Sequence, residues 1–355
     1  MPLLNDEQVM LRDMAREWVD NESPVAAFRK MRDTAPAFGF DTQSAATQGE
    51  MGWFGVTIPE EFGGSAFGFL SLGLVLEQLG RNLVASPLAA SAVAATVIAE
   101  AGSDEVKAKW LPRLATGEVV ATLAVDEGPN HDPTRFSTSV NGGKLTGDKA
   151  FVAEGDAAEL FLVAATDGLY LVADGEGVSR STRHMADCRS HAAVSFADAA
   201  TEKLGGPELT ARAVDLATAA TCAEMLGMAE SAFQQTLDYL KQRVQFGQVL
   251  STFQALQHRM AKMFTELQLM RSAVEGALEA VDAKRSDLDQ AVSLAKAVGG
   301  ETLKLVSREM VQLHGGVGMT DEYDAGLYLK RAAVLEAMWG NSAYHRDRFG
   351  RLNGY

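Results

Sequence analysis

The most informative part of the sequence is the junction of two predicted helices, where Arg243-Val244-Gln245-Phe246-Gly247 is followed by Phe253-Gln254-Ala255-Leu256-Gln257-His258. A cation, an aromatic ring and an amide gather at this junction. Arginine supplies planar, permanently charged donors for a pyrophosphate, and the amides at a helix N-terminus add partial positive charge. The junction therefore suits a dinucleotide. The alternative is a plain helix cap, in which Gly247 ends the helix and Phe246 fills the core.

A second segment, Gln312-Leu313-His314-Gly315-Gly316-Val317-Gly318, ends a predicted helix with three glycines. Glycine permits positive φ and allows the backbone to approach a ligand closely. Such a loop on its own can simply turn the chain. Together with the first segment, it favours nucleotide binding.

Along the rest of the chain, the pattern of apolar residues changes twice. Residues from about 5 to 120 have helical spacing of apolar positions, and Ser103 can cap a helix that begins near Asp104. Short β-type runs separated by Gly, Asp and Asn follow, and long helical patterns return after Glu208. We predict an α+β fold with an all-α N-terminal domain (1–120), a small middle β domain (121–206) and a C-terminal four-helix bundle (207–355).

Particular segments carry these predictions. Helices are expected to include Gln8–Leu11, Ser71–Leu79, Ala211–Arg243, Ser251–Ala283 and Leu288–Leu313, with breaks at Pro59–Gly64 and Pro87 and a hairpin tip at 283–287. Strands are expected at Ala121–Val125, Leu160–Ala164 and Leu169–Val172.

Composition narrows the class of protein. A chain of 355 residues with 47% hydrophobic content can bury a sizeable core, and its net charge of -15 argues against a nucleic-acid binder. Residues 1–7 have neither a basic start nor an apolar core, and no stretch approaches about 20 uncharged apolar residues. We therefore expect a soluble cytoplasmic protein that binds no membrane. Cys188 and Cys222 are too few for a disulfide framework, and no histidines have HxH or HxxxH spacing, so no metal site is predicted.

The two motifs, in their order and spacing, resemble the acyl-CoA dehydrogenase family, and the resemblance covers essentially the whole chain. It extends to Pro59–Gly64, Lys109–Pro112, Gly117-Glu118 and Asn141–Lys149, which we also expect to be structural turns, and to Thr320, Glu322 and Arg331 after the glycine loop.

The resemblance implies FAD as cofactor, an acyl-CoA substrate, and a dimer of dimers in which each FAD lies between two subunits. By position, Arg243, Phe246 and Gln254 would contact the pyrophosphate region of the neighbouring subunit's FAD. Gln312, Gly315 and Gly316 would hold its adenosine end. We call these six residues the FAD-donor set. An electron-transfer flavoprotein is the implied electron acceptor.

The half of the site that would hold the flavin ring departs from the family. The usual Thr-Glu-Pro-x-x-Gly-Ser-Asp stretch is Asp126-Glu127-Gly128-Pro129-Asn130-His131-Asp132, and the usual Trp-Ile-Thr is Phe151-Val152-Ala153. The first threonine is thus an aspartate, and the hydroxyl expected near the ring is missing. An anionic Asp126 beside an anionic reduced flavin is unfavourable.

No catalytic base is assigned. The family's base, a carboxylate that removes the α-proton while hydride leaves the β-carbon, aligns within Ala337–Ser342 and falls on Gly340; the family's alternative position aligns near Ala217-Thr218. Asp215 and Glu336 lie close to these positions, but most helix carboxylates are solvated or ion-paired, which is the expectation for both. His258 and His314 are expected to be structural or pocket-lining groups.

Two hypotheses remain open. The chain is an FAD-dependent acyl-CoA dehydrogenase that works as a subunit of a larger oligomer, or it is a non-catalytic partner that completes the FAD site of a homologous chain. An acyl-CoA oxidase-like enzyme is a further alternative. The acyl group itself has no sequence motif, because pocket depth depends on helix packing.

Overall fold

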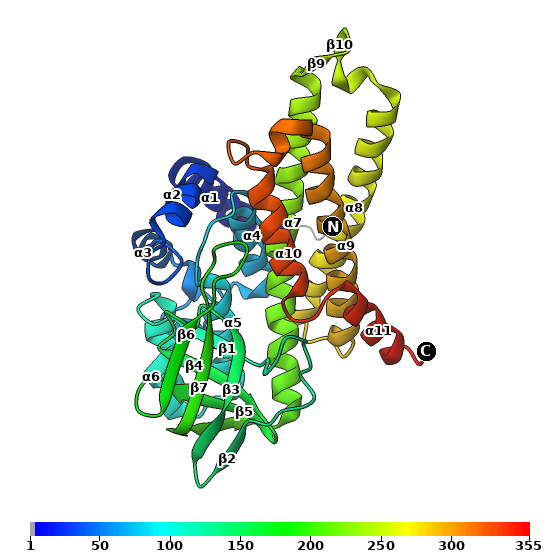
Figure 1. The fold of residues 1–355 in the computed structure, drawn as a ribbon. Helices are drawn as coiled ribbons and strands as arrows, with labels where there is room; N and C mark the ends of the chain where they lie inside the picture. Colours follow the sequence, from blue (N-terminus) through cyan, green and yellow to red (C-terminus); the bar gives the residue numbers. More distant parts are fainter. Residues whose placement is uncertain (1–3) are drawn as a thin grey trace. The chain divides into compact units, whose positions relative to one another are not determined.

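The computed structural model describes residues 4–355, and the first three residues, which entered the prediction about the N-terminus, lie outside the described part (Figure 1). The chain forms two compact units. One contains Met1–Phe28, Gly73–Val84 and Thr221–Tyr355, and the other contains Arg29–Leu72 and Ala85–Ala220. The first unit is mostly helical, whereas the second combines helices with two four-stranded sheets, so the predicted α+β class is confirmed. The three-domain division by sequence remains a proposal.

The N-terminal segment is helical, as predicted. Asn5 accepts the amide of Gln8 at 2.8 Å and the Gln8 side chain accepts the amide of Asn5, which makes a capping box for α1. Ser103 accepts the amide of Val106 at 3.3 Å and caps α6, which confirms the predicted cap. The helices here are α1 (Asp6–Glu22), α2 (Val25–Thr34), α3 (Thr42–Glu50), α4 (Gly68–Arg81), α5 (Leu88–Ala101) and α6 (Asp104–Ala115), with 3-10 turns η1 (Trp53–Gly55) and η2 (Glu60–Phe62).

Two sheets form the middle of the chain. The strands are β1 (Ala121–Ala124), β2 (Ser139–Asn141), β3 (Lys144–Ala153), β4 (Leu160–Ala165), β5 (Gly168–Ala173), β6 (Val178–Thr182), β7 (His191–Ala200) and β8 (Glu202–Gly205). One sheet has the order β1-β4-β5-β8, with β1 and β4 parallel, and the other has the antiparallel order β2-β3-β7-β6. Apolar residues of both sheets share one core that includes Phe161 and Phe196. The three predicted strands correspond to β1, β4 and β5.

The turn between β2 and β3 explains one of the family-like segments structurally. Asn141 pairs with Lys144, and Gly142 and Gly143 between them have φ of 56° and 75°. Two consecutive positive φ values define the type of two-residue hairpin that glycine favours.

The C-terminal region returns to long helices. They are α7 (Pro207–Gln242), α8 (Gln254–Asp282), α9 (Leu288–His314), α10 (Ala325–Ala337) and α11 (Ser342–Leu352), and α8, α10 and α11 all pack on α9. The predicted helices at 211–243, 251–283 and 288–313 correspond to α7, α8 and α9, and the predicted tip at 283–287 joins α8 to α9. In the part of the chain that the structure describes, no helix is both long and apolar enough to cross a membrane.

Within the first unit, α4 and α7 cross at unusually short range. A Cβ atom added at Gly227 would lie 1.7 Å from the carbonyl oxygen of Glu77, and one added at Gly80 would lie 2.2 Å from that of Glu224. Any side chain at either glycine would force the helix backbones apart.

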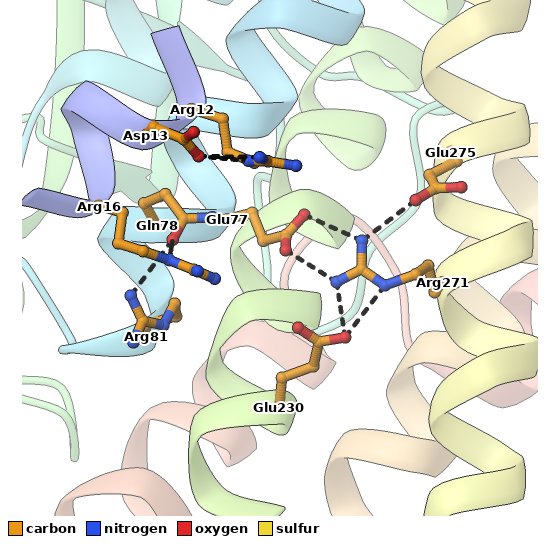
Figure 2. Close-up of polar contacts among 9 residues, drawn as sticks. All are labelled: Arg12, Asp13, Arg16, Glu77, Gln78, Arg81, Glu230, Arg271 and Glu275. Carbon is orange, nitrogen blue, oxygen red and sulfur yellow. Dashed lines mark hydrogen bonds and ion pairs between the residues drawn. The ribbon is translucent and has the colours of Figure 1, made fainter. Parts of the chain in front are cut away.

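An ion cluster lies beside this crossing, on α4, α7 and α8 (Figure 2). The Arg271 guanidinium donates to Glu77 at 2.8 Å, Glu230 at 2.6 Å and Glu275 at 3.1 Å. Burial raises the pKa of Glu77 above its usual value, although the adjacent guanidinium opposes this effect. Arg271 therefore compensates carboxylates that would otherwise be costly to hold in the bundle.

We predict that Arg271→Met lowers the free energy of unfolding by about 3–5 kcal/mol, because it leaves the Glu77 carboxylate buried without its guanidinium. Urea denaturation measures this. Arg351→Met is the control: its pair with Asp347 is exposed, so a change of about 0.5 kcal/mol or less is expected. Adding Glu77→Gln to Arg271→Met is expected to restore part of the loss. Equal, small effects of both arginine variants would show that the cluster does not stabilise the bundle.

Candidate functional site

The first predicted motif forms a β-hairpin at the tip of the helical region, between α7 and α8 (Figure 1). Its strands are β9 (Val244–Gln245) and β10 (Gln248–Val249), and a 3-10 turn η3 (Leu250–Thr252) leads into α8. Phe246 and Gly247 form the turn, with φ of 55° and 80°. The Phe246 side chain is 88% exposed, so the alternative in which it fills the core is wrong. Gly247 turns the hairpin rather than ending the helix.

The polar members of this motif also face outward. Arg243 and Gln254 are exposed, and Arg243 makes no ion pair with the described residues. The Phe246 and Phe253 rings meet edge to face with centroids 6.2 Å apart, which places Gln254 next to the hairpin. A large exposed aromatic ring and an uncompensated guanidinium are the features of a surface that another group covers.

The second predicted motif ends α9 and continues into the 3-10 turn η4 (Gly315–Met319). Gln312, Gly315 and Gly316 are exposed, and Gly315 has φ of 65°. No atom lies within 4 Å of a Cβ added at Gly315 or Gly316, so the space above this backbone is open. These residues fit a nucleotide that approaches the main chain closely.

The two motifs lie next to each other through side chains that the sequence analysis did not single out. The Tyr239 hydroxyl, on α7 one turn before Arg243, donates to the carbonyl oxygen of His314 at 3.3 Å. Their rings are 4.2 Å apart. The structure thus brings the Arg243 hairpin and the Gly315 loop together in one unit. The assignment of individual atoms of FAD to these residues stays a prediction.

The loop that departs from the family, residues 126–138, is closed on itself. Asp126 lies 2.8 Å from Nδ1 of His131, with both side chains largely buried. Glu127 accepts hydrogen bonds from the amides and hydroxyls of Ser137 and Thr138 and from Lys149. Partial burial opposes ionisation of Glu127, but these bonds outweigh it and lower its pKa to about 2.

The side chain of Lys149 on β3 holds this loop in place by hydrogen bonds. It is fully buried and donates to the carbonyl oxygen of Val125 at 3.0 Å and to Glu127 at 2.9 Å, with its ammonium over the Phe136 ring. Burial lowers the pKa of Lys149, and the Glu127 carboxylate counteracts this effect. The sequence analysis named Lys149 only as the end of a family-like segment and gave it no role. The signal available was a lysine directly before the apolar run Ala150–Ala153 in the predicted β domain.

The other departure, Phe151-Val152-Ala153, lies at the end of β3. Phe151 is 41% exposed, and the carbonyl oxygen of Ala153 accepts the Thr122 hydroxyl at 2.6 Å. The Ala153 side chain has no hydroxyl to offer a ligand, and the effect of this departure on a bound flavin stays a prediction.

The carboxylates near the aligned base positions differ from expectation. Asp215 on α7 is only 4% exposed, so it is not a solvated surface carboxylate; the other expectation, an ion-paired carboxylate, stays a prediction. Glu336 on α10 is half-buried and accepts the amide of Ser342 at 3.2 Å. The cause is the packing of the inward faces of these helices, which a search by sequence offset does not include.

The turn that contains Gly340 is held by a buried cation. The Lys296 ammonium on α9 is fully buried and donates to the carbonyl oxygens of Leu335, Glu336, Met338 and Gly340 at 2.6–3.2 Å. Burial lowers its pKa to about 8. Nε2 of His345 lies 2.8 Å from the carbonyl oxygen of Trp339. Both groups fix the turn, and the sequence analysis named neither.

The two cysteines differ in their exposure to solvent, and so do His258 and His314. Cys222 is buried and Cys188 is exposed, and both are free. His314 is 3% exposed and therefore structural in position, whereas His258 is exposed on α8.

This arrangement defines a known class of flavoenzyme. The model of the acyl-CoA dehydrogenase N-terminal domain matches residues 5–118, and the model of the C-terminal domain matches residues 205–352. Acyl-CoA dehydrogenase IpdE2 of Mycobacterium tuberculosis (strain ATCC 25618 / H37Rv) is 30% identical over 333 residues, which cover 92% of this chain and 91% of that protein. The chain belongs to the acyl-CoA dehydrogenase family, whose cofactor is FAD.

Further relatives and structures agree. Acyl-CoA dehydrogenase FadE34 of the same organism is 30% identical over 352 residues, covering 96% of this chain, and the chain spans about half (47%) of its length. A variant of the Tcur3481-Tcur3483 steroid ACAD has a TM-score of 0.92 at 29% identity, over 98% of each chain. The ChsE4-ChsE5 complex from Mycobacterium tuberculosis has a TM-score of 0.92 at 25% identity, over all of each chain.

We predict that Arg243→Ala weakens FAD retention by about 2–3 kcal/mol without unfolding the helices, because it removes a desolvated guanidinium from the pyrophosphate. Flavin absorbance after gel filtration and circular dichroism measure the two effects. Arg285→Ala, at the exposed tip between α8 and α9, is the matched control and is expected to retain FAD. Equal flavin content in the two variants would leave Arg243 no role in binding.

We also predict that Glu127→Gln makes thermal stability less dependent on pH. The folded-state pKa of Glu127 is lowered, so its ionised form stabilises the chain above the unfolded-state value of about 4.3 and this stability is lost as pH falls toward 2. Melting temperatures from pH 3 to 7 test this. Wild type is expected to lose more than the variant on acidification, and parallel curves would contradict the assignment.

Proposed function

We propose that the chain is a subunit of an FAD-dependent acyl-CoA dehydrogenase that oxidises a CoA thioester, and that its FAD-donor set completes the cofactor site of a neighbouring, homologous subunit. One observation carries the proposal. All six residues of the FAD-donor set are exposed, and the space above Gly315 and Gly316 is open. By contrast, the carboxylates of Asp126 and Glu127 in the loop of residues 126–138 bond to other residues of the chain.

The polar groups in the two halves of the site favour a chain that contributes to its neighbour's FAD site rather than holding the flavin ring itself. Arg243 offers a cation without an ion-pair partner among the described residues, which suits the pyrophosphate of a bound FAD. The opposite half offers Asp126, already engaged with His131, and Ala153, which has no hydroxyl. FAD, when bound, supplies hydride acceptance from the β-carbon of the substrate. The homologous subunit would supply the ring contacts and the catalytic base.

The relatives narrow the substrate class. Because the Tcur3481-Tcur3483 protein is a steroid ACAD, we propose a bulky CoA ester with a steroid-derived acyl group. The ChsE4-ChsE5 complex supports an assembly of two different homologous chains. We further propose an electron-transfer flavoprotein as the electron acceptor and the cytoplasm as the location.

A second candidate is a homo-oligomer that uses its own base. The observation in its favour is the burial of Asp215, which lies on α7 near the aligned alternative position at Ala217-Thr218. A buried carboxylate is a better general base than a solvated one when burial brings its pKa closer to neutrality.

We predict a dimer or tetramer at micromolar concentration, because a donor set that faces outward has no use in a monomer. Light scattering of the chain, alone and coexpressed with a homologous chain, measures this. A monomer under both conditions would remove the basis of the proposal.

The two candidates differ in the activity of the chain alone. We expect little reduction of a dye acceptor by a steroid-derived acyl-CoA with the chain alone, and turnover after coexpression with a homologous chain that carries the base. The alternative gives a yellow protein with stoichiometric FAD, whose turnover is abolished by Asp215→Asn or Glu336→Gln. Observing that second result would replace the partner-subunit proposal with the homo-oligomer.

A further inference from the structure

Three aromatic rings meet where the two donor motifs approach each other. His314, the last residue of α9, is buried and lies between Tyr239 of α7, at 4.2 Å, and Tyr323 of the segment after η4, at 4.3 Å between ring centroids. The two tyrosine rings are 6.3 Å apart. The imidazole thus fills the space between two separate parts of the chain.

The proton position on His314 follows from its partner. Nδ1 lies 2.7 Å from the carbonyl oxygen of Met310, and a carbonyl oxygen only accepts hydrogen bonds, so Nδ1 carries a hydrogen. Nε2 is buried and has no hydrogen-bond partner among the described residues. Burial lowers the pKa of His314, which keeps the ring neutral with its lone pair on Nε2.

His314 is linked to both halves of the donor set through Tyr239 and through its own main chain. Tyr239 donates its hydroxyl to the His314 carbonyl oxygen at 3.3 Å, and its own carbonyl oxygen accepts the Arg243 amide at 2.9 Å. On the other side, His314 is bonded directly to Gly315. Displacing the imidazole would therefore change the spacing between Arg243 and the open backbone at Gly315 and Gly316.

We propose that His314 is a positioning residue of the FAD-donor set. Its neutral imidazole, packed between the tilted rings of Tyr239 and Tyr323, fixes the Gly315 loop against the Arg243 hairpin so that both contact one dinucleotide. This inference rests on the proposed function. It adds a residue without a direct contact to FAD, and it makes FAD binding depend on the protonation of one buried ring.

The sign of that dependence follows from the surroundings. The groups that face the ring are the Tyr239 hydroxyl of α7, the Met310 carbonyl of α9, and Tyr323 beside Asp324 in the following segment. Among the described residues, none of these groups makes a hydrogen bond with Nε2. A histidine whose folded-state pKa is lowered favours the ordered loop above the unfolded value of about 6.5, and this preference is lost as pH falls below it.

The test uses the assembled complex of this chain with whichever homologous subunits copurify, and titrates FAD into the apo complex between pH 5 and 8. Wild-type affinity is expected to fall on acidification. His314→Phe keeps a ring without the Nδ1 donor, and His314→Asn keeps a donor without the ring. Both are expected to weaken FAD binding at pH 7.5 by about tenfold, the equivalent of one net hydrogen bond, and to flatten the acid limb of the pH profile.

A matched control separates this role from general stability. Phe233→Leu disturbs another ring pair of the same bundle, Phe233 with Phe264 at 6.2 Å, and is expected to lower stability while leaving the pH profile of FAD affinity unchanged. If Arg243→Ala weakens FAD binding and both His314 variants match wild type, the positioning role is wrong and the proposed function stands. If no variant, Arg243→Ala included, changes FAD binding, both are wrong.

A measurement on the wild-type chain covers the case in which the variants do not fold. Protonation that weakens FAD binding requires, by linkage, that bound FAD lowers the pKa of His314. Nitrogen-15 chemical shifts of the imidazole, followed against pH with and without FAD, give this pKa directly. An unchanged pKa on FAD binding, or a hydrogen on Nε2 at pH 7.5, would overturn the proposal.

Discussion

The close crossing of α4 and α7 is the constraint on which the helical unit depends. Gly227 and Gly80 bring the two backbones to a separation that no side chain at either position would allow. Beside this crossing the Glu77 side chain is buried, and Arg271 on α8 compensates its charge. The crossing therefore joins residues 73–84 to the C-terminal helices and determines where α8 lies relative to both.

A bundle held in this way leaves its functional groups at its ends. The Arg243 hairpin follows the last turn of α7, and the Gly315 loop follows the last turn of α9, so their separation depends on how these helices pack. The Tyr239–His314 contact joins the ends of α7 and α9 directly. By contrast, the turn at Gly340 is held from inside by Lys296, whose four carbonyl acceptors fix its backbone whatever side chains it carries.

Periodicity and turn residues predicted the helices and strands well, because amphipathic spacing and capping are local properties: Ser103 caps α6, and β1, β4 and β5 lie where apolar runs were found. The residues of the FAD-donor set came from the family resemblance, because either motif alone also fits a plain cap or turn, and their contacts with FAD stay a prediction. The burial of Asp215 and the four carbonyl contacts of Lys296 depend on the packing of separate elements, and the Asp126–His131 pair depends on how its loop folds back on itself. No spacing along the chain encodes these, so the sequence could not show them.

The electrostatics of the two half-sites argue for a shared cofactor more strongly than either half does alone. The chain has a net charge of -15, which opposes the approach of an anionic dinucleotide unless local cations are left uncompensated. Arg243 is such a cation, whereas Lys149 of β3 pairs with Glu127 of the loop at residues 126–138. An exposed Arg243 beside an exposed Phe246, together with an Asp126 that is paired inside its own loop, favours the proposal that the donor half serves another subunit.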